Sequence, residues 1–448
     1  MPDHQRHPSP QSLRALDWLN FFLADVRTGV GPFLAVYLAS ALHWNPARIG
    51  VAMSAMSVGS ILAQTPAGAV IDGITRKRLV VVAAAVVVSA SCLLMAATDN
   101  FYGIVSAQAM AGIAADIFPP AIAALTLGLV GRQHMSLRIG RNEAFNHAGN
   151  VAAALLAGVI GSYLIDRGVF YLTAVLAVGS IVSVLLIRAN EIDHQLARGC
   201  DDGEAGKEKP ARLRDLFRDR RLGFFAFAVA LFHFANAAML PQIGQELAEG
   251  KRAAPLYMSA CIIVAQLVMI PTVVLAGKWA AGWGRKPVFL LGFAVLPVRG
   301  VLYTVTTNQN ALIAIQVLDG IGAGIFGVVS VLVIADLTQG TGRFNVTQGA
   351  VTTAQGIGAA LSTLIAGVIT SAAGYNAGFL TLAAIALAAL LVFSYGVPET
   401  KTSHKLLSPA GAWTGSRVER TSGEGALQPA PLGVEAEIHG ESVGRGGE

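Results

Sequence analysis

The sequence has little charge and few cysteines. Only 13% of its 448 residues are Asp, Glu, Lys or Arg, whereas 54% are hydrophobic, and the mean hydropathy is +0.58. Water-soluble domains need charge over their surfaces, so this composition is typical of a polytopic membrane protein. The three cysteines, Cys92, Cys200 and Cys261, have the spacing of neither a metal site nor a disulfide framework. Since a nucleotide-binding loop is also absent, we expect no metal and no cofactor.

Charge is missing altogether from long stretches. Residues 344–398 are 55 consecutive uncharged positions, divided only by Gly374-Tyr375-Asn376. Each piece exceeds the roughly 20 apolar residues that cross a bilayer core as a helix, whereas a β-barrel would show alternating segments of about ten residues. We therefore predict an all-α membrane protein with twelve transmembrane helices in two pseudo-symmetric six-helix bundles. The expected spans lie near 14–41, 47–72, 78–98, 100–130, 139–165, 168–188, 222–248, 254–281, 287–307, 309–338, 345–372 and 376–397.

Lys and Arg are distributed unevenly between the two sides of these spans. If the N-terminus is inside, that side holds 21 of them and the other side holds four, Arg48, Arg167, Lys251 and Arg252. The positive-inside rule then predicts cytoplasmic termini, in a protein of the cell inner membrane. The net charge of +5 follows from this bias and indicates no nucleic-acid partner. The first apolar span is too long for a cleavable signal peptide.

Composition divides the chain into five parts, and the two large ones are similar. The expected parts are a cytoplasmic N-terminal segment (1–13), a six-helix bundle (14–189), a polar cytoplasmic linker (190–221), a second bundle (222–397) and a disordered cytoplasmic tail (398–448). Gly112–Phe118 matches Gly320–Phe326 at an offset of 208 residues, and the loop after the second span recurs after the eighth at an offset of 209. A duplicated bundle is the usual plan of a transporter.

That repeated loop carries a motif. In GAVIDGITRKR, a glycine is followed four residues later by Asp72 and then by a basic pair, and the second copy, GKWAAGWGRKP, has Ala281 in place of the aspartate. With twelve spans and a six-plus-six repeat, the chain resembles the major facilitator superfamily over about residues 14–398. The resemblance implies a gate: Asp72 would cap a helix N-terminus of the other half when the cytoplasmic side closes. Alternatively, the basic residues only fix topology. The loop residues in question are Gly68, Asp72, Arg76, Lys77, Gly277, Arg285 and Lys286.

Ionisable and polar side chains within the spans are costly and indicate function. Asp25 and Arg27 lie near the middle of the first span on different faces. In the fifth span, polar residues at i, i+3, i+4 and i+7 share one face, and the eleventh span has a similar stripe. We predict that these stripes are facing walls of a pathway; the alternative is a hydrogen-bonded seam between helices. They are Glu143, Asn146, His147 and Asn150 in the fifth span, and Gln348, Thr352 and Gln355 in the eleventh.

Further charges occur in the second half and beside a kink in the first. We expect Arg299 and Asp319 to pair across the ninth and tenth spans, either as a static or as a switching pair. Asp116, beside Phe118-Pro119-Pro120, has no obvious partner, and Pro241 could break the seventh span. The expected pathway residues are Asn20, Arg27, Asp116, Asn146, His147, Asn150, Asn236, Arg299, Gln316, Gln348, Thr352 and Gln355.

These features predict a secondary active transporter, not an enzyme, that moves a small solute by alternating access and couples this movement to protons. Asp25 is the first candidate proton carrier and Asp319 the second, followed by His233, which titrates in the useful range, and Glu143. Arg27 or Arg299 could hold an anionic solute. A passive facilitator and, less favoured, a non-transporting membrane sensor are the alternatives. The expected partners are the solute, protons and the lipid bilayer, and we expect a monomer.

Overall fold

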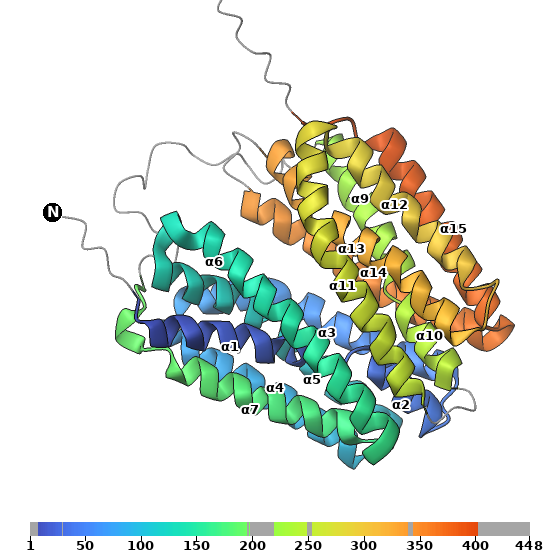
Figure 1. The fold of residues 1–448 in the computed structure, drawn as a ribbon, viewed down its shortest axis with the longest axis horizontal. Coiled ribbons are helices and arrows are strands. Elements are labelled where there is room, and N and C mark those ends of the chain that lie inside the picture. Colours follow the sequence, from blue (N-terminus) through green and yellow to red (C-terminus); the bar gives the residue numbers. More distant parts are fainter. Residues whose placement is uncertain are drawn as a thin grey trace, which may run out of the picture. The chain divides into compact units, whose positions relative to one another are not determined.

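The computed structural model describes residues 8–28, 30–194, 197, 219–248, 253–338 and 344–401. The predicted N-terminal segment, linker and tail therefore lie largely outside the described residues. The helices in chain order (Figure 1) are α1 (Pro10–Val26), α2 (Pro32–Ser40), α3 (Pro46–Gly73), α4 (Lys77–Ala97), α5 (Phe101–Ala115), α6 (Phe118–Val159), the π-helical turn η1 (Ile160–Leu164), α7 (Gly168–Leu186), the 3-10 turn η2 (Ala189–Glu191), α9 (Arg220–Asn236), α10 (Met239–Ala248), α11 (Ala254–Gly282), α12 (Arg285–Leu302), α13 (Gln309–Leu337), α14 (Phe344–Ala373) and α15 (Tyr375–Gly396).

All twelve predicted spans are helical, and the predicted fold class is confirmed. Ten of them, within the described ranges, are long and apolar enough to cross a membrane by length and composition alone. The other two are the broken pair α1–α2 and α12, which carries Arg285, Lys286 and Arg299. Helix α6 continues from the fourth span into the fifth through a kink at Gly131, where φ is 70°. Large apolar side chains such as Leu62, Val175 and Tyr395 are exposed, as expected for surfaces that face lipid.

Three of the spans are broken near their middle. Helix α1 ends at Val26, and α2 begins at Pro32 after a turn in which Val30 has φ 74°. A left-handed backbone is strained for a β-branched residue, and such strain is concentrated at functional sites. The fourth span breaks between α5 and α6 at Asp116, just before Pro119-Pro120. The seventh breaks between α9 and α10, at Ala237 and Ala238. Pro241 therefore lies within the first turn of α10, where a backbone N–H would have no helical partner.

The two halves are structural copies with a local difference. Helix pairs α3 and α11, α4 and α12, and α7 and α15 start 208, 208 and 207 residues apart. Gly112 on α5 and Gly320 on α13 stand at equivalent crossings, where a Cβ atom would overlap the carbonyl oxygen of Met56 or Ala265. The broken fourth span, however, corresponds to the continuous helix α13. One half is therefore irregular where its copy is regular.

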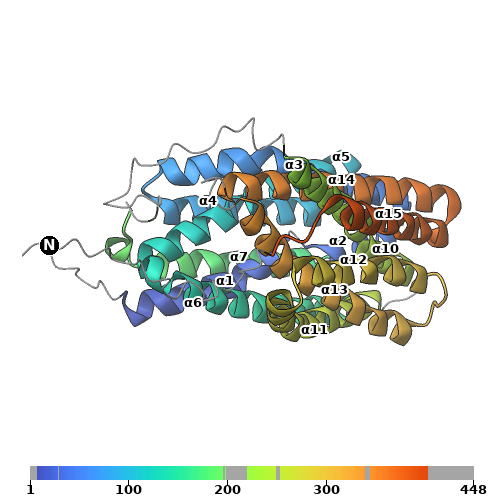
Figure 2. The same cartoon turned by 90° about the horizontal axis from the view of Figure 1, so that it is seen from above.

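The halves contact each other most extensively through α3 with α14, α6 with α11, and α2 with α10, and α11 also contacts α2 and η1. In both views α2 and α10 lie together (Figures 1 and 2). In Figure 1 they lie at one end of the bundle, and the ribbons of α6 and α11 diverge away from that end. Near it, Gly50 and Gly367 allow α3 and α14 to approach closely, and the Ser162 hydroxyl accepts a hydrogen bond of 3.1 Å from the backbone of Leu256. The opposite end, which carries the basic connections such as Arg76–Arg78 and Arg285–Lys286, is called the basic end below.

Candidate functional site

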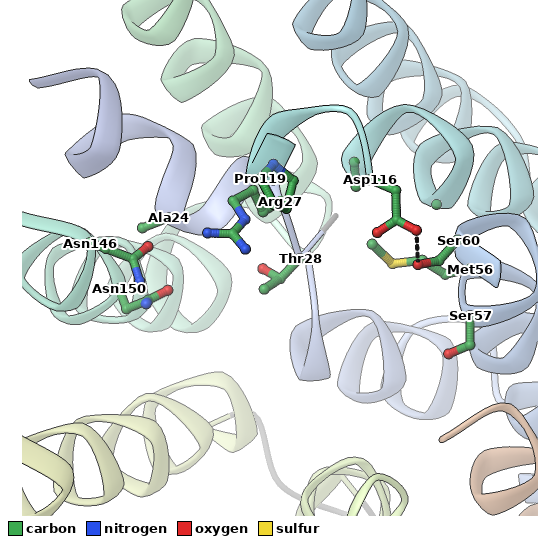
Figure 3. A pocket seen from close by; sticks show the side chains of 12 residues that line it. Ala24, Arg27, Thr28, Met56, Ser57, Ser60, Asp116, Pro119, Asn146 and Asn150 are labelled. Atoms are coloured by element: carbon green, nitrogen blue, oxygen red, sulfur yellow. Dashed lines mark hydrogen bonds between the residues drawn. The ribbon is translucent and has the colours of Figure 1, made fainter. Parts of the chain in front are cut away.

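A cavity of about 490 Å³ lies within the first half, between α1, α3, α5 and α6 (Figure 3). It is located at the breaks of the first and fourth spans, so helix ends as well as side chains border it. Broken helices at this depth are where transporters bind solutes, because a break frees backbone polar groups from helical pairing. The lining residues are Ala24, Arg27, Thr28, Met56, Ser57, Ser60, Gly112, Ala115, Asp116, Pro119, Asn146 and Asn150.

Arg27 supplies the positive charge of the cavity. It follows the last residue of α1, where a cation is favourable because the helix dipole is negative. The side chain is half-buried and, among the described residues, its guanidinium makes no hydrogen bond and no ion pair. The acidic groups that act on it through space are Glu143 and Asp116. The sequence analysis placed Arg27 in the pathway; Arg27 lines this cavity, and its role in a transport pathway stays a prediction.

Asp116 supplies the negative charge. It follows α5 and accepts a hydrogen bond of 2.7 Å from the Ser60 hydroxyl on α3. Although Asp116 and Arg27 line the same cavity, no ion pair joins them in the described part of the chain. Figure 3 shows the guanidinium of Arg27 on the side of Asn146 and Asn150, and Asp116 turned toward Ser60. The two charges therefore stand on opposite sides of the opening.

The polar stripe predicted on the fifth span is present on α6, but its members have different surroundings. Asn146 and Asn150 line the cavity, and Asn146 donates a hydrogen bond of 3.2 Å to Glu143, which is exposed. His147 contacts the other half instead, since its Nδ1 lies 2.8 Å from Oε1 of Gln266 on α11. The stripe is thus partly a cavity wall and partly an interhelical seam.

The first candidate proton carrier, Asp25, does not line the cavity. Its carboxylate accepts a hydrogen bond of 2.7 Å from Thr173 on α7. It and Arg27 therefore project in different directions, as their spacing predicted. Asn20, expected in the pathway, is buried and donates to the carbonyl of Leu16 in its own helix. Both residues contribute to packing around α1 rather than to the cavity surface.

Charged and polar groups in the second half form a network of ion pairs and hydrogen bonds. The predicted pair of Arg299 and Asp319 is confirmed, and the side chains are only 2% and 17% exposed. The guanidinium of Arg299 also donates a hydrogen bond of 2.8 Å to Asn236 at the end of α9. Gln316, one turn from Asp319 on α13, donates to the hydroxyl of Tyr303 at 3.0 Å. These contacts join α9, α12 and α13, although Nε of Arg299 and Oε1 of Gln316 are buried without a hydrogen-bond partner among the described residues. None of these residues lines the cavity.

The other predicted residues of the second half also lie away from the cavity. Nδ1 of His233 donates a 3.2 Å hydrogen bond to the Val229 carbonyl, and the ring packs edge-on against Phe326 within a cluster of phenylalanine rings. On α14, Thr352 bonds to the backbone of Gln348 in its own helix, and neither they nor Gln355 line the cavity. The contacts of α14 with the first half include a 3.0 Å hydrogen bond from the Thr353 hydroxyl to Oε1 of Gln64 on α3.

The two copies of the loop motif are built differently. Lys77 is buried and donates to the carbonyls of Ile71 and Ile74, so it caps the C-terminal end of α3. Arg76 is exposed at the start of α4, and the side chain of Asp72 lies outside the described residues. The predicted contact of Asp72 with the other half is therefore not tested. Gly68 and Gly277 lie within α3 and α11.

In the second copy, where Ala281 stands in place of the aspartate, a carboxylate from elsewhere in the chain caps the helix that follows the loop. Glu399, beyond α15, accepts hydrogen bonds of 2.8 and 3.0 Å from the backbone N–H groups of Arg285 and Lys286 at the start of α12. Desolvation alone would raise the pKa of Glu399, but the backbone hydrogen bonds from Lys401, Arg285 and Lys286 outweigh it and hold this pKa below its ordinary value. The Arg285 side chain pairs with Asp336 at 3.0 Å. In the sequence, Glu399 is visible as an acidic residue shortly after the last span, but nothing there indicates its partners at the start of α12.

A second feature that the sequence did not predict ties α1 to α6 toward the basic end. Asp17 is buried and receives Arg138 at 2.6 Å and Arg141 at 2.8 Å, and Arg138 also donates to Asn142. Arg138 is 7% exposed at its side chain, whereas Arg141 is 58% exposed. An acidic residue in the first span and two arginines at the start of the fifth were the available signal.

Two repeated six-helix bundles, with a charged cavity at helix breaks, define a membrane transporter. Comparison with known proteins gives the family. A sequence model described as the Major Facilitator Superfamily matches residues 17–272 and 222–433, and the chain belongs to this family of transporters, which are not enzymes.

Two proteins of Mycobacterium tuberculosis, each described as an uncharacterized MFS-type transporter (Rv2456c and MT2531), are 49% identical to this chain over 396 residues. Each alignment covers 88% of this chain and 95% of the relative. Among solved structures, the nucleoside transporter NupG matches with a TM-score of 0.69 at 14% identity, over 85% of this chain and 98% of that one. A mutant of the same transporter gives a TM-score of 0.72. At this identity the match shows a shared fold only.

Proposed function

We propose that this protein is a secondary active transporter that binds its solute in the cavity between Arg27 and Asp116 and carries it across by alternating access. The observation that supports this most is the position of the cavity: its two charges stand at the breaks of α1 and α5, near the middle of their spans. We infer that the cavity opens toward the basic end in this state, because the ribbons of α6 and α11 diverge toward that end (Figure 1). We assign the basic end to the cytoplasm of a cell inner membrane, with both termini on that side of a monomer.

We further propose that transport is coupled to protons through Asp116. A coupling carboxylate must exchange protons with water in the cavity. Asp116 lines the cavity, and among the described residues its side chain has one hydrogen-bond partner, the neutral hydroxyl of Ser60. Asp25 is turned toward α7, away from the cavity. Asp319 is a weaker candidate, because protonating it would leave the charge of buried Arg299 without its anionic partner. His233 packs against aromatic rings, and Glu143 lies outside the cavity lining, so neither is our candidate.

The test is proton flux in proteoliposomes that contain the purified full chain and a pH-sensitive dye. Pools of organic acids, sugars, amino acids, nucleosides and cationic drugs are added in turn. We expect one pool to move protons with the wild type and with Asp166→Asn, an exposed control outside the cavity, but not with Asp116→Asn. Loss of flux in Asp25→Asn or Asp319→Asn, with Asp116→Asn active, would assign coupling to those residues instead.

A passive facilitator gives a different result in the same assay. It would equilibrate a labelled solute without moving protons, whatever the residue at position 116. A non-transporting sensor would neither move protons nor equilibrate any solute, and that result would contradict the transport proposal as a whole.

A further inference from the structure

Arg27 and Asp116 are opposite charges that line one cavity without pairing. In the second half, by contrast, Arg299 and Asp319 neutralise each other directly. Taking a charge out of water is expensive unless a partner compensates it. The separation of Arg27 from Asp116 across a cavity of about 490 Å³ therefore leaves both charges available to a ligand that fits between them.

Resting on the proposed function, we infer that the solute is a zwitterion, an organic molecule with one anionic and one cationic group. Its anionic group would bind the guanidinium of Arg27, and its ammonium group would bind the carboxylate of Asp116. Neutral polar side chains support each end. Figure 3 places the amides of Asn146 and Asn150 on the Arg27 side and the hydroxyl of Ser60 at Asp116.

The charge balance of the lining provides the selectivity. The lining contains one cation and one anion, and the next acidic group, Glu143, is exposed and outside it. A zwitterion satisfies both charges at once, whereas a simple anion leaves Asp116 unpaired and a simple cation leaves Arg27 unpaired. A neutral solute satisfies neither charge fully.

The lining also argues against a nucleoside. Its apolar members are Met56, Pro119 and small residues, and the described lining includes no aromatic ring. Protein sites for nucleobases commonly stack the base on an aromatic side chain. A compact aliphatic zwitterion needs no such platform and can occupy the space between the two charged ends.

Binding of the solute's ammonium group to Asp116 determines how the movements of solute and protons are coupled. The carboxylate of Asp116 can hold either a proton or the ammonium group of the solute, but not both. Solute loading and proton loading therefore compete at one residue, so each conformational cycle carries one or the other. The consequence is exchange: solute moves against protons rather than with them.

The experiment measures uptake of labelled probes into proteoliposomes that contain the full chain. The zwitterionic probes are β-alanine, γ-aminobutyrate, δ-aminovalerate and ε-aminocaproate, which separate the two charges by increasing lengths. Glutarate is the anionic probe, cadaverine the cationic probe and uridine the neutral one. We expect one zwitterion to be taken up about tenfold faster than the other three probe types.

Two variants should change which probe is preferred, a result that loss of folded protein cannot produce. Removing the cation with Arg27→Gln should shift preference toward cadaverine, and removing the anion with Asp116→Asn should shift it toward glutarate. Arg14→Gln, an exposed change at the other end of α1, and Asp166→Asn serve as matched controls that keep the wild-type preference. A gain of uptake for the opposite probe in each variant would support the assignment.

The overturning results are distinct from failure of the transport proposal. If uridine, glutarate or cadaverine is the preferred probe and neither variant alters the preference, the protein is a transporter but its solute is not a zwitterion bound between these residues. Transport only of a solute outside the panel, unaffected by both variants, overturns the inference in the same way. If no solute of any pool moves, the proposed function itself fails.

Discussion

The two halves of this transporter use similar charges in opposite ways. In the first half, Arg27 and Asp116 line a cavity without touching, whereas in the second half Arg299 and Asp319 form a buried pair held further by Asn236. The repeat makes the contrast specific: Asp116 is 208 residues from Gly324, which lies in the unbroken helix α13. Duplication preserved the fold, but the charges were placed independently in each copy. We infer that the first half binds the solute and that the charge pair of the second half holds α12 and α13 together.

The largest effect should follow from breaking the buried pair. Arg299→Met leaves Asp319 without a cation and should lower the free energy of unfolding by about 3–5 kcal/mol. The double variant Arg299→Met with Asp319→Leu removes both charges and should recover most of that loss. Thermal unfolding in detergent measures both. Equal stability of the single variant and the wild type would show that the pair has no structural role.

A smaller loss of stability is expected at the Asp17 cluster in the first half. Arg138→Gln removes a buried cation that also bonds Asn142, and should cost about 2 kcal/mol. Arg141→Gln removes an exposed cation from the same carboxylate and should cost less than about 1 kcal/mol. The same unfolding assay compares them, and a reversed order would contradict the difference in burial.

Removing the cavity cation should affect transport rather than folding. Arg27→Gln should lower uptake of the preferred solute by about tenfold or more, which corresponds to about 1.4 kcal/mol. Arg27 makes no hydrogen bond or ion pair to the described residues. The unfolding midpoint of the Arg27→Gln variant should therefore stay close to that of the wild type. Arg27→Lys keeps the charge and should retain part of the activity. A clearly lower unfolding midpoint of Arg27→Gln would show that Arg27 stabilises the fold and would contradict this prediction.

The smallest effect concerns the cap on α12. Because the pKa of Glu399 is held below its ordinary value, its carboxylate stabilises the fold at pH above the ordinary value of about 4.3, and this contribution is lost as the pH falls through the lower folded value. Glu399→Gln should therefore cost a few tenths to about 1 kcal/mol at neutral pH, since solvent screens the site. Unfolding curves should show a difference in stability between the wild type and Glu399→Gln at neutral pH, and this difference should disappear at acidic pH. A difference that grows in acid would have the wrong sign.

Much of the fold was predictable because the bilayer imposes it. Uncharged stretches longer than a membrane crossing identified the spans within a few residues, and the repeat identified the two bundles. The pair of Arg299 and Asp319 followed from equal depth on neighbouring helices. These predictions depended on periodicity and length, which the sequence displays directly.

The site was harder to predict, because side-chain direction depends on the breaks. Asp25 seemed the best mid-membrane acid, yet the end of α1 at Val26 directs it to Thr173 and directs Arg27 into the cavity. Asp116 gained importance only once the turn before α6 placed it opposite Arg27. The role of Glu399 depends on a contact 114 residues away along the chain, which no local pattern contains.

The most direct test of this account is a cryo-EM structure of the full chain bound to the solute that the proteoliposome assay identifies. The account predicts solute density between Arg27 and Asp116, with the pair of Arg299 and Asp319 intact. Density beside Asp319 with that pair broken, and an empty space between Arg27 and Asp116, would contradict it.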